Sequence, residues 1–265
     1  MAEGLIANAV ALITAMLVLW RVAARIGDVS FVDAVWGGGM AGLALLSWVS
    51  LVAPGARATL IMGMTVAWGA RLALHLFSRW RRDGEDARYA KILGPSRKAG
   101  LYEVTALRRV FGPQAILLFV TCLPAQLGIL ASPASAPLGA LALGGAALWM
   151  IGFAFETVGD RQLARFRADP ASKGRVLDSG LWRYTRHPSY FGDACAWWGI
   201  WLACADAGWV VALASLPGPL FLTFTLTRWS GKPLLEKGMS DRRPAYADYV
   251  RRTSGFLPWP PRKAP

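Results

Sequence analysis

Acidic residues, histidine and cysteine are all scarce in this sequence. Its 265 residues include 16 Asp or Glu, two His and three Cys, against 29 Lys or Arg. Cys122, Cys195 and Cys204 have neither CxxC nor Cys/His spacing, so they indicate no zinc site and no disulfide framework. No metal is therefore predicted.

Charge of both signs is low, which favours a membrane protein. Charged residues make up 17% of the chain and hydrophobic residues 55%, and the mean hydropathy is +0.37. A soluble domain usually has about a quarter charged residues. Because apolar runs recur from one end to the other, a single membrane domain over residues 1–265 is predicted. The N-terminal run lacks a charged region before it and a small-residue cleavage site after it, so it predicts a first span rather than a cleaved signal.

The apolar runs predict an all-α, polytopic membrane protein with about seven transmembrane helices. A spanning helix needs about 20 mostly apolar residues. Runs of suitable length lie at 5–24, 30–53, 58–78, 110–131, 136–158, 190–205 and 207–227. Only Asp206, Ala207 and Gly208 mark a boundary between the last two, so an even number of spans is the alternative.

The placement of the basic residues predicts the orientation. Of the 29 basic residues, 25 lie in the stretches 79–109, 159–187 and 228–265. The positive-inside rule then places these stretches and the C-terminus in the cytosol, with the N-terminus outside. Orientation and anionic lipid account for the net charge of +13, so the predicted partner is the lipid bilayer and not nucleic acid. No protein partner is predicted.

Ionisable residues inside spans are candidates for function, because burying them in lipid is costly. Asp33 begins the second span, and Arg71 and His75 share one face of the third. Asp33 is predicted to pair with Arg71, either as an ion pair that fixes helix packing or as part of a polar cavity. The G-x-G-x-x-G run 37–42 is set aside as a nucleotide motif, since it lies within an apolar span; its glycines predict close helix packing.

Two polar stretches predict ordered structure. Residues 79–89 interleave acids, bases and aromatics, which suggests an ordered, salt-bridged loop rather than a plain topogenic run. A solvated charge cluster stays open as an equal alternative. Residues 156–198 combine acids, arginines, aromatics and His187-Pro188. Arginine binds phosphate or carboxylate oxygens in pairs, and a helix that begins near a proline presents an N-terminus to an anion. The prediction is an anionic cofactor held by approximately 156–265, with Glu236, Tyr246 and Tyr249 folding back to close the site.

These stretches resemble the membrane-bound steroid 5-alpha-reductase superfamily, most closely its bacterial branch of uncharacterised proteins. The resemblance runs from Val32–Gly37 through Gly84–Tyr89 to the tail, and Gly180–Trp198 is its most specific part. It implies a seven-helix, multi-pass protein of the bacterial inner membrane that binds NADPH at its cytosolic loops. The implied function is an NADPH-dependent oxidoreductase that reduces an activated C=C bond in a steroid-like or other lipid-soluble substrate.

The resemblance carries over by position. Asp160, Arg167, Arg175, Tyr184, Gly192, Asp193 and Trp197 match the family's cofactor pattern in order, Ser189 stands where asparagine is usual, and Arg71 matches an arginine of the third helix. The cofactor-binding residues implied are Arg71, Asp160, Arg167, Arg175, Tyr184, Arg186, His187, Ser189, Tyr190, Asp193, Trp197 and Glu236. The family's Gln-Glu pair and its tyrosine, whose position falls near Trp68, are not matched. Asp33, oriented by Arg71, is the candidate catalytic residue.

Two alternatives stay open. Arg186-His187-Pro188-x-Tyr190 with Glu236 also resembles the isoprenylcysteine-type membrane methyltransferases, which implies S-adenosylmethionine as cofactor. Against it, Asp160, Arg167 and Arg175 suit a pyrophosphate or 2′-phosphate better. A transporter or lipid-binding protein is the third reading, although its polar residues are expected near the midplane of the bilayer rather than at one face.

Overall fold

The computed structural model describes residues 1–135, 137–229, 231–236, 239 and 243–262. Within these residues the protein is helical and no strand forms, which confirms the all-α prediction for them; the bridge between Thr185 and Ser254 is isolated. The chain divides into two compact units. The first unit is Met1–Leu143 with Ile200–Gly218, and the second unit is Gly144–Gly199 with Pro219–Pro265.

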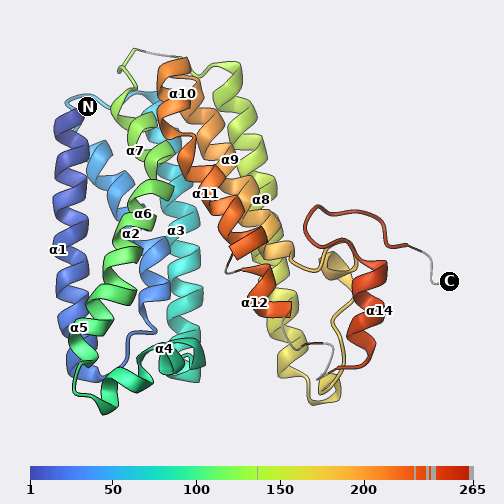
Figure 1. The fold of residues 1–265 in the computed structure, drawn as a ribbon. Helices are drawn as coiled ribbons and strands as arrows, with labels where there is room; N and C mark the ends of the chain where they lie inside the picture. The colour runs from blue at the N-terminus through green and yellow to red at the C-terminus, as the bar shows by residue number, and fades with distance from the viewer. Residues whose placement is uncertain (136, 230, 237–238, 240–242, 263–265) are drawn as a thin grey trace. The chain divides into compact units, whose positions relative to one another are not determined.

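The first unit is built on three long helices. In sequence order its elements are α1 (Ala2–Ile26), α2 (Val32–Val49), α3 (Ala56–Asp83), α4 (Ala87–Lys98), α5 (Tyr102–Ala106), a π-helical turn η1 (Leu107–Phe111), α6 (Gly112–Thr121), α7 (Leu123–Leu130) and α10 (Trp209–Ser215). Helix α1 contacts α2, α2 packs along α3, and α7 lies against both α2 and α3 (Figure 1).

Two glycines allow α2 and α3 to approach closely. A Cβ atom added to Gly37 would collide with the backbone carbonyl of Gly69, and one added to Gly69 would collide with that of Gly37. Small residues let helix backbones meet in this way inside membranes. The prediction that the 37–42 glycines serve helix packing is confirmed for Gly37, and the run lies within α2 rather than at a strand-to-helix turn.

The predicted loop 79–89 is largely helical, which corrects the sequence interpretation. Helix α3 continues past the apolar run to Asp83, because its arginines are good helix formers, and it ends at Gly84 in the left-handed region. Asp86 then caps α4 by accepting a hydrogen bond from the Arg88 amide at 2.9 Å. The predicted salt bridges in this stretch are confirmed, since Arg88 pairs with Asp86 and Arg82 with Asp83.

The predicted span 110–131 is displaced in the structure. A continuous helical stretch runs over Tyr102–Thr121, through α5, η1 and α6. The chain then breaks at Cys122, and Pro124 lies in the first turn of α7. Proline lacks the amide that would continue the helix, so α6 and α7 are separate.

The weakest predicted boundary is confirmed. Helix α9 ends at Ala205 and α10 begins at Trp209, with Gly208 between them at a φ of 123°. Asp206 is fixed in this turn because it accepts from the Gly139 amide at 2.9 Å and pairs with the buried Arg57 at 3.4 Å.

The second unit contains the long helix α8 and the polar segment that follows it. Its elements are α8 (Ala140–Ala168, from Gly144 on), the 3₁₀ turns η2 (Pro170–Ser172) and η3 (Gly180–Arg183), α9 (Pro188–Ala205, up to Gly199), α11 (Pro217–Phe224, from Pro219 on), the π-helical turn η4 (Thr225–Trp229), α12 (Lys232–Glu236) and α14 (Ala245–Arg252). Gly152 of α8 and Gly192 of α9 approach each other as Gly37 and Gly69 do.

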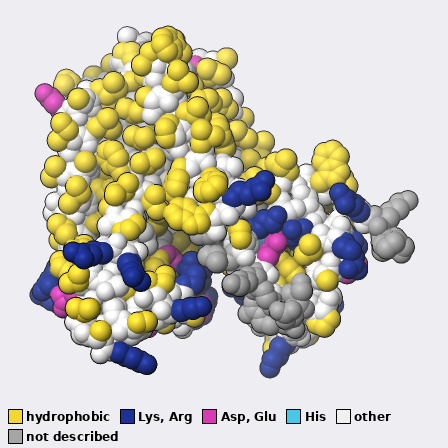
Figure 2. Space-filling model, viewed as in Figure 1, with side chains coloured by type: hydrophobic (Ala, Val, Ile, Leu, Met, Phe, Trp, Pro, Cys, Tyr) yellow, Lys and Arg dark blue, Asp and Glu magenta, His cyan; other side chains and the backbone are white. Residues whose placement is uncertain are grey.

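Six described helical stretches are long and apolar enough to cross a membrane, so the chain is a multi-pass membrane protein by length and composition. They are Ala2–Ile26, Val32–Val49, Ala56–Asp83, Tyr102–Thr121, Ala140–Ala168 and Trp209–Trp229. The predicted span 190–205 is helical, as α9, but is not among the six. In Figure 2, apolar side chains cover most of the visible first unit, and its Lys and Arg gather at the end where α4 and α5 lie.

Candidate functional site

A buried cluster of charge joins the start of α9 to the C-terminal segment. Arg186 Nε donates to Glu236 Oε1 at 2.9 Å, and His187 Nε2 lies 2.8 Å from the same oxygen. Arg186 also donates to the backbone oxygens of Thr253 at 2.6 Å and Val250 at 3.2 Å. Arg186 and His187 are 8% and 6% exposed, so this is an interior ion pair rather than a surface contact.

The surroundings of Glu236 keep it ionised. Burial alone would raise its pKa, but the hydrogen bonds from His187 and Arg186, with the charge of Arg186, outweigh burial and lower the pKa of Glu236 to about 2. Carboxylate and guanidinium therefore hold each other in place throughout the physiological pH range.

The C-terminal segment is tied along residues 182–186. The Arg186 amide donates to the Ser254 carbonyl at 2.9 Å, and the Thr185 hydroxyl donates to the Phe256 carbonyl at 2.9 Å. The Tyr249 hydroxyl donates to the Trp182 carbonyl at 2.5 Å, and burial raises the pKa of this phenol. The prediction that the tail folds back onto this segment is confirmed.

The beginning of α9 is also attached to α8. The Ser189 hydroxyl donates to Asp160 Oδ1 at 2.6 Å, and Pro188 packs on Gly159. The imidazole of His187 stacks on the ring of Tyr190 with a centroid distance of 5.4 Å and an interplanar angle of 5°. Predicted cofactor residues from α8, α9 and α12 therefore meet around one helix N-terminus: Asp160, Arg186, His187, Ser189, Tyr190 and Glu236.

The other six predicted cofactor residues differ in burial. Arg167 and Arg175 are exposed, and Tyr184 is 42% exposed. Asp193 is partly buried and Trp197 fully buried, both within α9. Arg71 belongs to α3 of the first unit, where it is partly buried.

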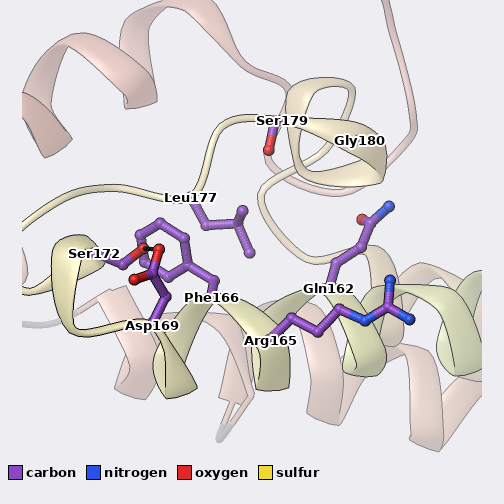
Figure 3. Close-up of a pocket in the computed structure, with 8 residues that line it drawn as sticks. All are labelled: Gln162, Arg165, Phe166, Asp169, Ser172, Leu177, Ser179 and Gly180. Carbon is purple, nitrogen blue, oxygen red and sulfur yellow. Dashed lines mark hydrogen bonds between the residues drawn. The ribbon is translucent and has the colours of Figure 1, made fainter.

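A pocket of about 330 Å³ opens in the second unit, between the end of α8 and the segment after it. Figure 3 shows Gln162 and Arg165 projecting from α8 on one side, the apolar side chains of Phe166 and Leu177 in the middle, and Asp169 with Ser172 on the other side. Ser179 and Gly180 complete the lining. None of the predicted site residues lines this pocket, so the sequence interpretation missed it; the signal available was the spacing of Gln162, Arg165, Phe166 and Asp169 along one helix face.

Asp33, the candidate catalytic residue, lies in a polar cluster of the first unit, and its contacts correct the predicted pairing. Arg88 donates to Asp33 Oδ2 at 2.7 Å, the Tyr89 hydroxyl donates to Oδ1 at 2.6 Å, and Arg79 lies 3.6 Å away. The predicted partner was Arg71. The segment beyond α3 folds back as α4 and brings Arg88 and Tyr89 to Asp33, which spacing along α3 could not reveal.

A directional chain of hydrogen bonds ends at Asp33. Trp36 Nε1 donates to Gln114 Oε1 at 2.8 Å, Gln114 Nε2 donates to the Tyr89 oxygen at 3.0 Å, and Tyr89 donates to Asp33. Burial first, and then the charge of Asp33, raise the pKa of Tyr89, so its phenol stays protonated. Tyr89 and Gln114 were not predicted as site residues, although Tyr89 ends the Gly84–Tyr89 run.

The chain matches, over residues 19–253, the model of a family described as "Protein of unknown function (DUF1295)", and it belongs to that family. No curated protein and no solved structure matches it.

Proposed function

We propose that this member of the DUF1295 family is a membrane oxidoreductase that uses NADPH to reduce an activated C=C bond in a lipid-soluble substrate. The main support is that six predicted cofactor residues lie together at the start of α9. These residues come from distant parts of the sequence, between Asp160 and Glu236. A framework of buried ion pairs and tail contacts at this point is suited to holding a rigid binding surface.

The residues of the second unit fit an anionic dinucleotide. Exposed arginines on and after α8, including Arg165, Arg167 and Arg175, offer paired donors to phosphate oxygens. The pocket beside them adds hydroxyls, an amide and an apolar middle. Its volume of about 330 Å³ is near the lower end for small-molecule sites, so it takes one end of a dinucleotide rather than the whole. When bound, the cofactor supplies the hydride.

The buried Arg186–Glu236 pair has a supporting part in this proposal. The guanidinium of Arg186 already binds a carboxylate and two backbone carbonyls, so its donors hold the tail rather than a phosphate. Arg186 and Glu236 would therefore be positioning residues for His187, which contacts Glu236, and for Tyr190, on which His187 stacks.

The polar cluster of the first unit suits the oxygen of an activated alkene. Hydride addition to a C=C bond conjugated to a carbonyl builds negative charge on the oxygen, and that charge needs hydrogen-bond donors. Asp33 accepts from Arg88 and Tyr89, so it cannot be that donor itself. We assign the donor role to Arg88, whose Nε and Nη2 bind Asp86 and Asp33 and whose Nη1 makes none of these hydrogen bonds. Asp33, Tyr89 and Gln114 are then positioning residues.

Direct cofactor binding tests the proposal. Purified protein in lipid nanodiscs is titrated with NADPH, and binding at micromolar concentration is expected. Arg167→Ala should weaken it about tenfold, because a charge-assisted hydrogen bond contributes roughly 1.5–3 kcal/mol. Arg25→Ala, which removes one positive charge from α1 of the first unit, is the matched control and should bind as the parent does. Absence of saturable NADPH binding would contradict the proposal of an NADPH-dependent oxidoreductase.

A methyltransferase that uses S-adenosylmethionine is the second candidate. The contact of Glu236 with Arg186 and His187 supports this candidate, because these residues carry the resemblance to the isoprenylcysteine-type methyltransferases. The guanidinium of Arg186 also binds a carboxylate and backbone carbonyls rather than facing a phosphate, which fits a cofactor without phosphate groups. A ligand that binds only the folded protein raises its melting temperature. Thermal shifts measured with NADPH and with S-adenosylmethionine distinguish the oxidoreductase from the methyltransferase. We expect NADPH alone to raise the melting temperature. If S-adenosylmethionine alone raised it, the methyltransferase would become the better-supported function.

A further inference from the structure

The pocket at the end of α8 has a polar side, and its main hydrogen-bond donor, Arg165, is available to a ligand. Arg165 lines this pocket and is exposed. In the part of the chain that the structure describes, no side chain lies within hydrogen-bond or ion-pair distance of its guanidinium. Arg167 is two positions further along α8 and does not line the pocket, because residues two apart point to different faces of a helix. Arg165 is therefore the arginine that this pocket offers to a ligand.

The neighbouring polar groups are fixed in place. Gln162 Oε1 accepts from the Leu181 amide at 3.0 Å, which leaves the Gln162 NH2 group as a donor. Gly180 makes this possible, since its φ is +59° and a Cβ there would collide with the Gln162 side chain. The side chain of Gln162 therefore stands beside Arg165 in a set position (Figure 3).

The acidic residue of the pocket is already engaged. Asp169 Oδ1 accepts from the Ala171 amide at 2.9 Å, and Oδ2 accepts from the Ser172 hydroxyl at 3.3 Å. Asp169 thus caps η2, and Figure 3 places it across the pocket from Arg165, beyond Phe166 and Leu177. The Arg165 side remains cationic and rich in donors, while the middle is apolar.

We propose that this pocket binds the adenosine end of the nucleotide cofactor and that Arg165 holds its 2′-phosphate. The inference rests on the proposed function and adds the residue that selects NADPH over NADH. A terminal phosphate presents three oxygens, which the planar guanidinium binds in pairs and the Gln162 amide supplements. Phe166 and Leu177 offer the apolar contact that an adenine ring needs. The limited volume of the pocket suits this end of the molecule.

The experiment measures binding of small probes to the full chain in nanodiscs, without any turnover. The probes are adenosine 2′,5′-bisphosphate and 5′-AMP, which differ only in the 2′-phosphate, followed by NADPH and NADH. The parent protein should prefer the 2′-phosphorylated member of each pair. Arg165→Gln should reduce that preference by about tenfold to a hundredfold, the range for a lost charge-assisted pair of hydrogen bonds, while 5′-AMP affinity changes little.

Two variants serve as controls. Arg161→Gln removes the same charge from an exposed position on α8 that does not line the pocket, and it should keep the preference. Arg165→Lys keeps the charge but loses the planar fork, so it should retain part of the preference and show whether Arg165→Gln merely unfolded the site.

The outcomes separate the two proposals. If the parent binds NADPH and Arg165→Gln keeps the full preference for it, this inference is overturned and the oxidoreductase proposal stands. If the parent fails to bind NADPH but binds adenosine 2′,5′-bisphosphate through Arg165, the pocket assignment holds and the oxidoreductase proposal fails. If no probe with a 2′-phosphate binds better than its partner without one, the assignment of Arg165 is wrong.

Discussion

Replacing Glu236 by alanine removes the carboxylate that joins Arg186 and His187. The guanidinium of Arg186 would then stay buried, at 8% exposure, without its counter-charge. Loss of one partner of a buried pair generally costs about 3–5 kcal/mol. Here the side chain of Glu236 is 21% exposed and Arg186 keeps the carbonyls of Val250 and Thr253, so we expect the lower part of that range or slightly less, about 2–3 kcal/mol.

The cost should appear as local opening of the C-terminal segment. The amides of Arg186, Thr253 and Trp259 donate to backbone carbonyls within this segment and its anchor. A local destabilisation of about 2–3 kcal/mol corresponds to roughly 30- to 150-fold faster hydrogen exchange at such amides. Exchange followed by mass spectrometry on Glu236→Ala should show this acceleration in 184–187 and 249–259, with the amides of α2 and α3 unchanged.

Asp248→Asn is the matched control for this experiment. Asp248 pairs with Arg251 and Arg252 on α14, in the same segment, but these pairs are at the surface. Surface pairs of this kind contribute little to stability. If Glu236→Ala exchanged within about threefold of the parent, or no faster than Asp248→Asn, the reasoning that a buried pair anchors the tail would be refuted.

Three further predictions concern other parts of the molecule. Because the folded-state pKa of Glu236 is lowered from 4.5 to about 2, the stabilisation that Glu236 provides is complete above pH 4.5 and is lost as the pH falls toward 2. Hydrogen exchange of the C-terminal segment, corrected for intrinsic rates, should therefore be constant from pH 7 to 5 and become faster below pH 5. Faster exchange already between pH 7 and 5 would contradict this prediction. Arg88→Ala should lower the reduction rate about a hundredfold, the usual loss for one donor to a developing oxyanion, while NADPH affinity stays unchanged; an unchanged rate would exclude Arg88 from the proposed mechanism. Gly37→Ala should destabilise the α2–α3 contact by about 1–3 kcal/mol and lower the melting temperature in detergent. Gly42→Ala is the control, because a Cβ atom at Gly42 has no neighbouring atom within 4 Å, and it should leave the melting temperature unchanged. Equal effects of the two substitutions would disprove the close-packing argument.

Helix formation and membrane class followed from the sequence itself. Apolar runs such as 5–24 and 58–78 are long enough to cross a bilayer, and the cost of unpaired backbone groups in lipid leaves a helix as the form they take. The same local reasoning found the close approach at Gly37, because glycine within an apolar helix has few other uses. It was less reliable where a helix continued beyond its apolar run, as α3 does to Asp83.

The partners of individual polar side chains were decided only by the tertiary structure. Asp33 was expected to meet Arg71 because both lie in spans, but α4 turns back and supplies Arg88 and Tyr89. Similarly, the sequence analysis placed Arg186 and Glu236 at one site, yet only the folded tail makes them an ion pair 50 residues apart. Hydropathy and helix periodicity are local properties that each segment carries alone, whereas a hydrogen bond depends on where the packing of the helices and the folding of the tail bring two distant side chains.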